Sequence, residues 1–557
     1  MKTNKRCCGA AVAWVLALGL LTCGCSASPA DTSETAVPPS ATEPAEQLET
    51  GYICALDLNI PYYDEEGTLL GTLPRGTRVE YQTDSDGRPA IRLEDLTVYL
   101  PPEGAGIVSD PADVIPSHTL YVQTAANLRD EAGKLLPAFA EVGSLVLVTG
   151  YDYLTDSGEA HMYRVDWNGE EGYITPWYLT DQQIPEVLFS DTVHASRGDR
   201  YGGGGALDLD YHPRQKGPIE GNQMPEECRA LYLVSWRLDE VDSYLQIAAE
   251  SGINAFVVDI LDGGSIGYAG EVMQEYCPSA VNAAHNTVEE YQTAIQKIRD
   301  AGYYVIGRIT TFNDTYFVKD HPEYAIADES GNPRKLASAY WPSPYCRAAW
   351  QYKVDLAVEA VELMGFHEIQ FDYVRFPDNM RRYEKAGTID FRNTYGETKA
   401  QAVQRFLMYA TDILHEHGAY VSADVYGESA FTYVTAYGQY WPAISNVVDV
   451  ISGMPYPDHF GQEGSWRPWE HPYDTLLGWG KAVMARQGET PTPAVVRTWI
   501  QAYNAIREPH NTYGPDEVAA QIQALRDSGC TGGYMTWNGK SSLDKYRSLI
   551  PAFEPQQ

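Results

Sequence analysis

The chain has 557 residues, which is too long for one ordinary hydrophobic core and indicates two to four domains. With 44% hydrophobic and 12% aromatic residues, its composition is that of a folded protein. Acidic residues outnumber basic ones by 76 to 40, and the resulting net charge of −36 repels phosphate backbones, which argues against nucleic acid as a partner.

The first 25 residues have the pattern of a bacterial lipoprotein signal. A short basic stretch precedes an apolar run over residues 10–21, which is too short to span a bilayer permanently. The run ends in Leu-Thr-Cys-Gly-Cys-Ser, with the small residue Gly24 directly before Cys25. We therefore predict lipidation at Cys25 and a chain anchored on the extracellular face of the bacterial membrane. An ordinary secretory signal is the alternative.

The cysteines outside this leader give no sign of a metal site. Four of the nine cysteines lie in the leader, and the other five are scattered, without any C-x-x-C pair. Neither a zinc site nor a disulfide framework is therefore predicted, although the sequence allows one bridge without selecting its partners. No metal or cofactor is expected.

The segments before the second half of the chain differ sharply in composition. Residues 26–50 are mainly Ser, Thr, Ala, Pro and Glu, which predicts a disordered tether. Short alternating runs broken by Gly, Pro and Asp then predict two small all-β domains, at residues 51–110 and 117–182. A second linker, rich in Gly and Pro, follows at residues 183–228.

The second β domain carries motifs of a known module. These are Tyr121-Val-Gln-Thr-Ala-Ala-Asn-Leu-Arg129, Tyr163-Arg-Val-Asp-Trp167 and Gly172-Tyr-Ile174. They resemble a bacterial SH3-like domain, and the first domain looks like a weaker copy. The resemblance implies a module of the kind that binds cell-wall peptides or glycans in some secreted proteins and is a spacer in others.

Residues 229–550 repeat a larger unit, an apolar run of strand length followed by an amphipathic helix. The predicted strands are residues 230–236, 253–261, 303–311, 368–376, 420–426, 447–454, 494–501 and 532–537. Helices are predicted between them, for example at residues 239–251, 289–301, 348–364, 400–417 and 516–528. Eight near-continuous apolar strands in a segment of about 250–330 residues predict an α/β fold, a closed (β/α)8 TIM barrel. A doubly wound open sheet is the alternative.

In such a barrel the active site lies at the C-terminal ends of the strands. Acidic residues stand there on three strands, namely Asp259 and Asp262, then Asp372, then Asp424, and Glu428 follows shortly after. Other residues at these ends are predicted to bind substrate together with Asp259 and Asp262: Trp236, Arg308, Arg375, Tyr456, Arg497, Trp499, Gln501 and Trp537.

This set of acids predicts hydrolysis of a glycosidic bond. Charged residues in barrel strands are costly unless they are paired or functional, and a structural ion pair between Arg308 and Asp259 is one alternative. Two carboxylates that flank a bond are the usual arrangement for glycoside hydrolysis. Asp372 and Asp424 stand on neighbouring strands and can face each other, while Glu428 could reach in from the rim.

Four motifs carry a resemblance that covers the whole barrel. They are Tyr303-Tyr-Val-Ile-Gly-Arg-Ile309, Asp320-His-Pro-Glu323, Trp341-Pro-Ser-Pro-Tyr345 and Glu368-Ile-Gln-Phe-Asp-Tyr-Val-Arg-Phe-Pro377. They resemble the bacterial putative glycosyl hydrolase domain family (domain of unknown function 4015). That family is similar to the α-amylase-like barrels, in which a fourth-strand Asp is the nucleophile and a fifth-strand acid donates the proton. The resemblance implies Asp372 as the nucleophile and leaves the donor between Asp424 and Glu428.

The sequence thus predicts a monomeric, surface-anchored glycoside hydrolase that acts on a cell-wall or extracellular polysaccharide. The alternative is a non-catalytic glycan-binding or cell-wall-organising lipoprotein with a degenerate barrel. The sequence does not select the sugar, the linkage or the stereochemical outcome.

Overall fold

The computed structural model describes residues 48–185, 198–336 and 339–553. The predicted lipidation site, Cys25, lies outside the described residues. The chain divides into two units, Met1–Glu49 and Thr50–Gln557, and nearly all of the described structure belongs to the second. Within the described ranges, no helix has the length and apolarity that a bilayer crossing requires. The five described cysteines are free thiols.

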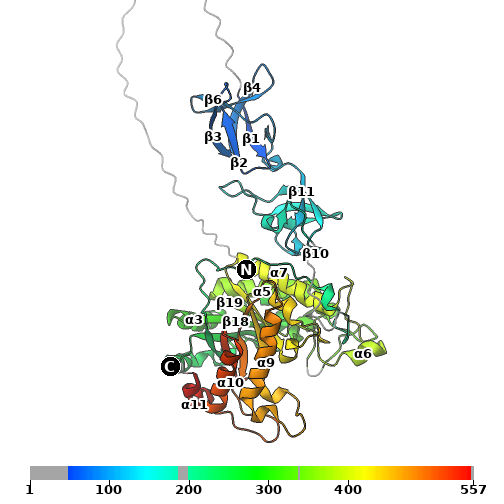
Figure 1. The fold of residues 1–557 in the computed structure, drawn as a ribbon, viewed down its shortest axis with the longest axis vertical. Helices are drawn as coiled ribbons and strands as arrows, with labels where there is room; N and C mark the ends of the chain where they lie inside the picture. The colour runs from blue at the N-terminus through cyan, green and yellow to red at the C-terminus, as the bar shows by residue number, and fades with distance from the viewer. Residues whose placement is uncertain (1–47, 186–197, 337–338, 554–557) are drawn as a thin grey trace, which may run out of the picture. The chain divides into compact units, whose positions relative to one another are not determined.

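The first β module is one antiparallel sheet, drawn in blue in Figure 1. Its strands are β1 (Glu49–Ala55), β2 (Asn59–Tyr63), β3 (Leu69–Pro74), β4 (Arg78–Thr83), β5 (Pro89–Leu93), β6 (Leu96–Tyr99) and β7 (Ala105–Val108), in the order β3-β2-β6-β5-β4-β1-β7. Alternate residues of β1 are buried, and Ile53, Ile91 and Val98 are core residues. This alternation is what a sheet with one face on a core requires.

The second β module repeats this arrangement. Its strands are β8 (His118–Val122), β9 (Ala126–Arg129), β10 (Leu135–Ala140), β11 (Leu145–Tyr151), β12 (Tyr163–Trp167), β13 (Glu170–Ile174) and β14 (Leu179–Thr180), in the order β10-β9-β13-β12-β11-β8-β14. A short 3-10 turn at Pro111–Asp113 separates the two sheets. The prediction of two small all-β domains ahead of the barrel is confirmed.

The third part is a parallel barrel. Its strands are β15 (Cys228–Leu233), β16 (Ala255–Asp262), β18 (Tyr304–Thr310), β19 (Glu368–Asp372), β20 (Tyr420–Tyr426), β21 (Val450–Met454), β22 (Val495–Val496), β23 (Thr498–Gln501) and β24 (Gly533–Trp537). The short β17 (Ser265–Ile266) folds back on β16. Only Arg497 separates β22, which pairs with β21, from β23, which pairs with β24. Together they form the seventh strand and close the ring, as the (β/α)8 prediction requires.

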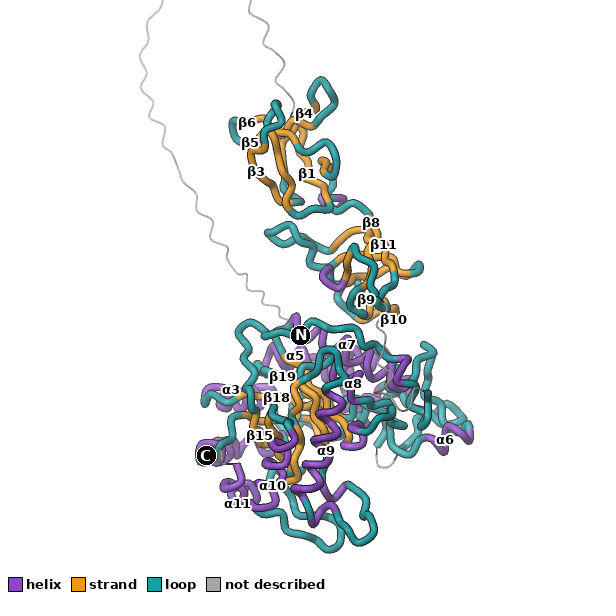
Figure 2. The backbone as a smooth tube through the Cα atoms, in the orientation of Figure 1, coloured by secondary structure: helices purple, strands orange, loops and turns teal. Residues whose placement is uncertain are grey.

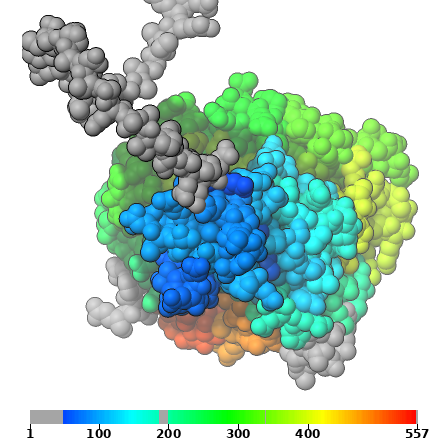
Figure 3. Space-filling model, turned by 90° about the horizontal axis from the view of Figure 1, so that it is seen from above, coloured from blue at the N-terminus to red at the C-terminus, as the bar shows by residue number. Residues whose placement is uncertain are grey.

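Helices surround the strands of the barrel, as Figure 2 shows in purple around orange. They are α1 (Val241–Ala249), α2 (Glu271–Tyr276), α3 (Val288–Asp300), α4 (Thr315–Asp320), α5 (Arg347–Met364), α6 (Arg381–Ala386), α7 (Lys399–Glu416), α8 (Trp441–Ser445), α9 (Pro472–Gln487), α10 (Pro515–Ser528) and α11 (Leu543–Phe553). In the space-filling view the two β modules are blue to cyan, and the barrel part runs from green to red (Figure 3).

A buried ion pair lies inside the barrel, near the N-terminal ends of the strands. Arg497 Nη1 contacts the two oxygens of Glu368 at 2.7 and 2.9 Å, and the Tyr304 hydroxyl donates to the same carboxylate at 3.1 Å. Glu368 and Tyr304 are the first residues of β19 and β18, so the Arg497–Glu368 pair lies at the opposite end of the barrel from the C-terminal ends of the strands. Arg497, which was predicted to bind substrate, is thus buried and paired with a carboxylate, and its side chain does not line the cleft at the strand ends.

Candidate active site

A cleft of about 730 Å³ lies at the C-terminal ends of the barrel strands. Eight of the predicted site residues line it: Asp262, Arg308, Asp372, Arg375, Glu428, Tyr456, Trp499 and Trp537. Tyr426, the last residue of β20, also lines it, and loops that follow the strands supply much of the rest, including Tyr373, Asp378, Phe431, Asp458, His459, Ile506 and Arg507. The barrel topology thus brings residues from distant parts of the sequence to one mouth.

Asp372 is held at the end of β19 by two hydrogen bonds. Its Oδ2 accepts from Arg308 Nη2 at 2.6 Å, and its Oδ1 accepts from the backbone N–H of Tyr373 at 2.6 Å. The residue is 5% exposed and faces the cleft. A carboxylate with a charged donor on one oxygen is stabilised in its anionic form, which suits a nucleophile.

The chain turns sharply directly after Asp372. Tyr373 has a φ of 49°, a left-handed conformation that non-glycine residues adopt rarely and often at functional sites. The strand was predicted to continue to residue 376, but β19 ends at Asp372. This turn places the Tyr373 N–H on Asp372 Oδ1 and sends Tyr373 and Arg375 into the cleft lining.

Arg308 is a single cation among four carboxylates. Besides Asp372, its guanidinium contacts Asp259 at 2.7 Å, Asp262 at 3.3 Å and Asp424 at 4.0 Å. Burial lowers the pKa of Arg308, but the three nearest carboxylates raise it, and its net pKa lies well above the ordinary value. One cation faces four carboxyls here, and the excess of negative charge favours protons on those of them that are fully buried.

Two of these carboxyls are the natural carriers of such protons. Burial raises the pKa of Asp424 well above its ordinary value, and the charge of Asp372 raises it further. Burial also raises the pKa of Asp259 to about 7, although Arg308 opposes this shift. Asp424 Oδ1 accepts a hydrogen bond from Trp499 Nε1 at 2.7 Å, whereas its Oδ2, 4.0 Å from Arg308 Nε, accepts no hydrogen bond from the described residues.

The raised pKa of Asp259 predicts a loss of stability as the pH rises. A carboxyl with a raised folded-state pKa favours the folded state below its unfolded pKa, near 4, and this contribution is lost as the pH passes about 7. We expect the free energy of unfolding of the wild type, relative to Asp259→Asn, to fall by up to about 3 kcal/mol between pH 4 and pH 8. Urea titrations across this range measure it; a constant difference would contradict the buried-proton interpretation.

Glu428 reaches the cleft from a loop rather than from a strand. It lies in a 3-10 turn, Gly427–Ala430, and is exposed. The Tyr437 hydroxyl donates to its Oε2 at 2.8 Å, and the Tyr433 hydroxyl donates to its Oε1 at 3.2 Å. Burial raises the pKa of Tyr437 well above its ordinary value, so this phenol stays a donor.

Arg375, in the lining of the same cleft, is held by hydrogen bonds and by aromatic rings. Its Nη2 donates to the Tyr426 hydroxyl at 2.5 Å and its Nη1 donates to the carbonyl oxygen of Phe376 at 3.0 Å. The guanidinium also lies over the rings of Tyr426 and Tyr373, 4.3 and 5.0 Å from their centroids. A rigid planar cation of this kind can orient the hydroxyls of a bound sugar.

Five predicted site residues do not line the cleft, and Arg497 has been described above. Asp424, Asp259 and Gln501 are buried beneath its floor, and Gln501 is engaged with the backbone of Asp458 and Tyr503. Trp236 is 44% exposed but stands apart from the cleft, where it packs against Arg237. These residues follow strand ends as predicted, but side-chain direction alternates along a strand, and only some of them face the opening.

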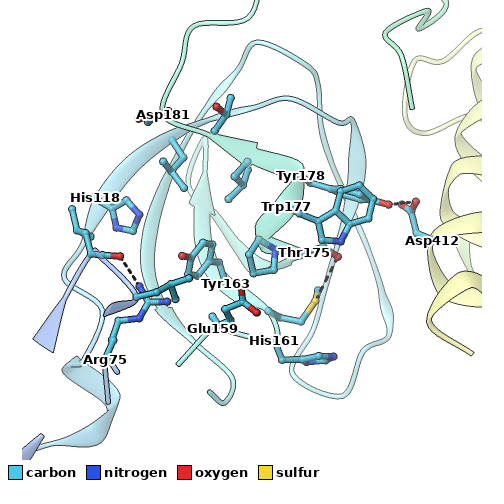
Figure 4. Close-up of a pocket in the computed structure, with 18 of the residues that line it drawn as sticks. Arg75, His118, Glu159, His161, Tyr163, Thr175, Trp177, Tyr178, Asp181 and Asp412 are labelled. Carbon is cyan, nitrogen blue, oxygen red and sulfur yellow. Dashed lines mark hydrogen bonds between the residues drawn. The ribbon is translucent and has the colours of Figure 1, made fainter. Parts of the chain in front are cut away.

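A second cleft, of about 790 Å³, is lined mainly by the second β module (Figure 4). Trp177, 48% exposed, lies in it with its ring edge-on to Tyr178 at 4.1 Å. The Tyr178 hydroxyl donates to Asp412 of α7, as the dashed line in Figure 4 marks. In the barrel cleft, by contrast, Asp262 and Asp372 both contact one buried arginine, Arg308.

Three comparisons with known proteins bear on the barrel. Residues 230–543 match the family model described as "Putative glycosyl hydrolase domain". Comparison with curated proteins gave no match. Among solved structures, a hypothetical protein from Ruminiclostridium thermocellum is 34% identical over 35% of this chain and 97% of its own, with a TM-score of 0.30.

Two further solved structures have low identity to the chain. The glycoside hydrolase domain of PgaB (BpsB) from Bordetella bronchiseptica is 14% identical over 58% of this chain and 99% of its own, with a TM-score of 0.42. A family 20 exo-β-N-acetylglucosaminidase from Vibrio harveyi is 13% identical over 59% of this chain and 54% of its own, with a TM-score of 0.38. The family model, which spans more than half of the chain, is the finding that assigns it: the chain belongs to the putative glycosyl hydrolase domain family, with the cleft at the barrel strand ends as its candidate active site.

Proposed function

We propose that the chain is a surface-anchored glycoside hydrolase that cleaves a cell-wall or extracellular polysaccharide with Asp372 and Glu428. The observation that carries this proposal is that these two carboxylates line one cleft in different settings. Asp372 is bonded to a buried arginine, whereas Glu428 is exposed and bonded to two tyrosine hydroxyls. Two carboxyl groups in unlike environments are what an acid and a nucleophile require.

With Asp372 as a nucleophile, the role that the resemblance to the α-amylase-like barrels implies, the proposed reaction proceeds in two displacements. A carboxylate oxygen of Asp372 attacks the anomeric carbon while Glu428 gives its proton to the glycosidic oxygen, so that the bond to the leaving sugar breaks. The glycosyl ester on Asp372 is then attacked by water, whose proton returns to Glu428. Arg308 stabilises the Asp372 carboxylate that is released at the end of each cycle.

Glu428 fits the acid/base role better than Asp424 does. The side chain of Asp424 is 0% exposed and lies below the cleft lining, so a leaving oxygen in the cleft cannot reach it directly. Burial and the charge of Asp372 raise the pKa of Asp424, which suits it to remain protonated beside the nucleophile. A protonated Asp424 leaves Asp372 as the anion that faces the substrate.

The substrate class follows from the walls of the cleft. Phe431 is 47% exposed in this lining, and Trp537 is partly exposed. Trp537 is backed by the buried rings of Tyr456, with centroids 6.4 Å apart and planes at 28°, and of Trp499, which it meets edge-on at 5.6 Å. Aromatic faces beside carboxylates suit a sugar ring, which has apolar C–H faces and a polar hydroxyl rim.

The experiment that tests the proposal is release of reducing ends from a panel of polysaccharides. The panel includes peptidoglycan, chitin, β-1,6-linked N-acetylglucosamine polymer, starch and mixed-linkage glucan, each incubated with the full-length protein. Hydrolysis of one of them that is absent with the double variant Asp372→Asn/Glu428→Gln supports the proposal. Binding to a polymer without product release would instead favour a non-catalytic glycan-binding lipoprotein.

Anchoring at Cys25 gives a separate prediction. In a bacterial host, Cys25→Ser should move the protein from the membrane fraction to the medium, because the residue that receives the lipid is lost. Cys23→Ser is the matched control and should stay with the membrane. Immunoblots of the two fractions measure this, and membrane retention of Cys25→Ser would contradict the assignment.

A further inference from the structure

Part of the segment predicted as a plain linker is fixed to the barrel. The backbone N–H of Ala400 donates to Gly203 O at 2.9 Å. Two side chains of α7 reach the same segment: Gln401 donates to Asp208 O at 2.9 Å and Gln404 donates to Asp210 O at 2.7 Å. The first turns of α7 therefore hold residues 203–210 in place.

Two glycines allow this segment to approach the barrel closely. A Cβ on Gly203 would lie 2.0 Å from Thr435 O, and a Cβ on Gly204 would lie 2.6 Å from the Thr398 side chain. Gly204 also has a φ of 112°, which side chains rarely permit. The glycine run thus brings the chain against the loop that follows Glu428.

This close approach places an aromatic ring of the linker beside the active-site loop. Tyr201 packs on Tyr433 with ring centroids 4.5 Å apart, and Tyr433 packs on Phe431 at 5.8 Å. Phe431 is 47% exposed and lines the cleft, whereas Tyr201 and Tyr433 are half-buried and lie beyond it. Three rings therefore follow one another from the edge of the cleft outward.

We propose that Phe431, Tyr433 and Tyr201 form a platform that binds the sugar units of a polysaccharide beyond the bond that is cleaved. The proposal rests on the proposed function, because its occupant is the glycan chain that leaves the cleft. Continuity with the cleft lining argues for this occupant, since Phe431 belongs to both surfaces. The Arg200 guanidinium, 5.2 Å from the Tyr201 ring, adds hydrogen-bond donors for sugar hydroxyls.

The platform makes the protein selective for long chains. A short oligosaccharide fills the cleft alone, while a longer one also covers the rings. Tyr433 has a second contact, because its hydroxyl bonds to Glu428. A purely positioning role for Tyr201, exerted through Tyr433 on Glu428, would change short and long substrates equally, and chain-length dependence separates the two roles.

The test measures binding, so that it does not depend on turnover. The full-length Asp372→Asn variant, in a detergent without a sugar head group, is titrated with chitin, cellulose and maltose oligosaccharides of two to eight units. We expect Kd in at least one series to fall about tenfold or more from the short to the long members. Tyr201→Ala should remove most of this gain and leave binding of the shortest member unchanged, while Tyr201→Phe should keep the gain.

The matched control is Tyr153→Ala, which removes an exposed tyrosine that stacks on His161 at 4.6 Å in the second β module. It should keep the full gain with length. The same gain in Tyr201→Ala, or no gain in any series, would overturn the platform. Hydrolysis without a gain in affinity would remove only this inference, whereas a gain without hydrolysis would remove only the catalytic proposal.

Discussion

Asp372→Asn should lower kcat on the cleaved polysaccharide by about 10⁴-fold, the scale of losing a covalent nucleophile. An amide does not form the glycosyl ester, and it loses the charge that stabilises the oxocarbenium-like transition state. The fold should remain, because Arg308 keeps Asp259 and Asp262 as partners and the amide oxygen can still accept one hydrogen bond. Reducing-end assays at saturating substrate measure the effect.

The control for this variant is Asp242→Asn on α1, whose side chain is 75% exposed and pairs with Lys297. It should have wild-type activity. A second variant, Asp372→Gly, should recover activity in azide and yield a glycosyl azide of inverted configuration, because azide replaces the missing carboxylate. More than a few per cent of wild-type activity in Asp372→Asn would contradict the nucleophile assignment.

The barrel was predictable because its strands are apolar on both faces. The runs at residues 303–311 and 420–426 coincide closely with β18 and β20, and both are almost wholly buried. A parallel sheet covered by helices imposes this composition, so the pattern of the sequence carries the fold. The split of the seventh strand into β22 and β23 was not predictable. It occurs at Arg497, whose side chain pairs with Glu368 of another strand, and this contact between distant residues cannot be read from the sequence.

The sequence predicted mainly those residues of the candidate site that stand at the C-terminal ends of strands. Asp372, Trp499 and Trp537 were found in this way because the ends of parallel strands share one edge. Phe431 and Ile506 could not be found, since they lie in loops whose paths follow from tertiary contacts. Three missed residues were signalled by the sequence: Tyr373 lies inside the motif ending at Pro377, Asp378 directly follows it, and Tyr426 ends a predicted strand.

The direction of side chains was the main limit of the sequence argument. Asp424 and Trp499 both belong to barrel strands, yet only Trp499 lines the cleft, while Asp424 lies beneath it and bonds to the indole. The residues before and after Asp424 in the strand are apolar, so the sequence does not show whether the Asp424 side chain is buried or faces the cleft. The choice between Asp424 and Glu428 as proton donor therefore required the three-dimensional structure, and it leads to the second large prediction.

Glu428→Gln should lower kcat on the polysaccharide by about 10²–10⁴-fold, because the leaving oxygen loses its proton donor. Glycosylation by a 2,4-dinitrophenyl glycoside of the same sugar should change little, since that leaving group departs without a proton. The loss should therefore depend on the leaving group, large for the polysaccharide and small for the activated glycoside. Steady-state kinetics of each variant on the two substrates measure these effects.

Asp424→Asn is the variant that decides between the two acids. A buried, protonated Asp424 acts on the charge of Asp372 rather than on the leaving group. Its replacement by an amide, which is also neutral, should therefore affect the polysaccharide and the activated glycoside alike. If Asp424→Asn instead slowed only the polysaccharide while Glu428→Gln slowed both substrates alike, the proton donor would be Asp424, and the cleft would have to open to its floor during catalysis. The same comparison of the two substrates thus tests both the identity of the acid and the rigidity of the cluster around Arg308.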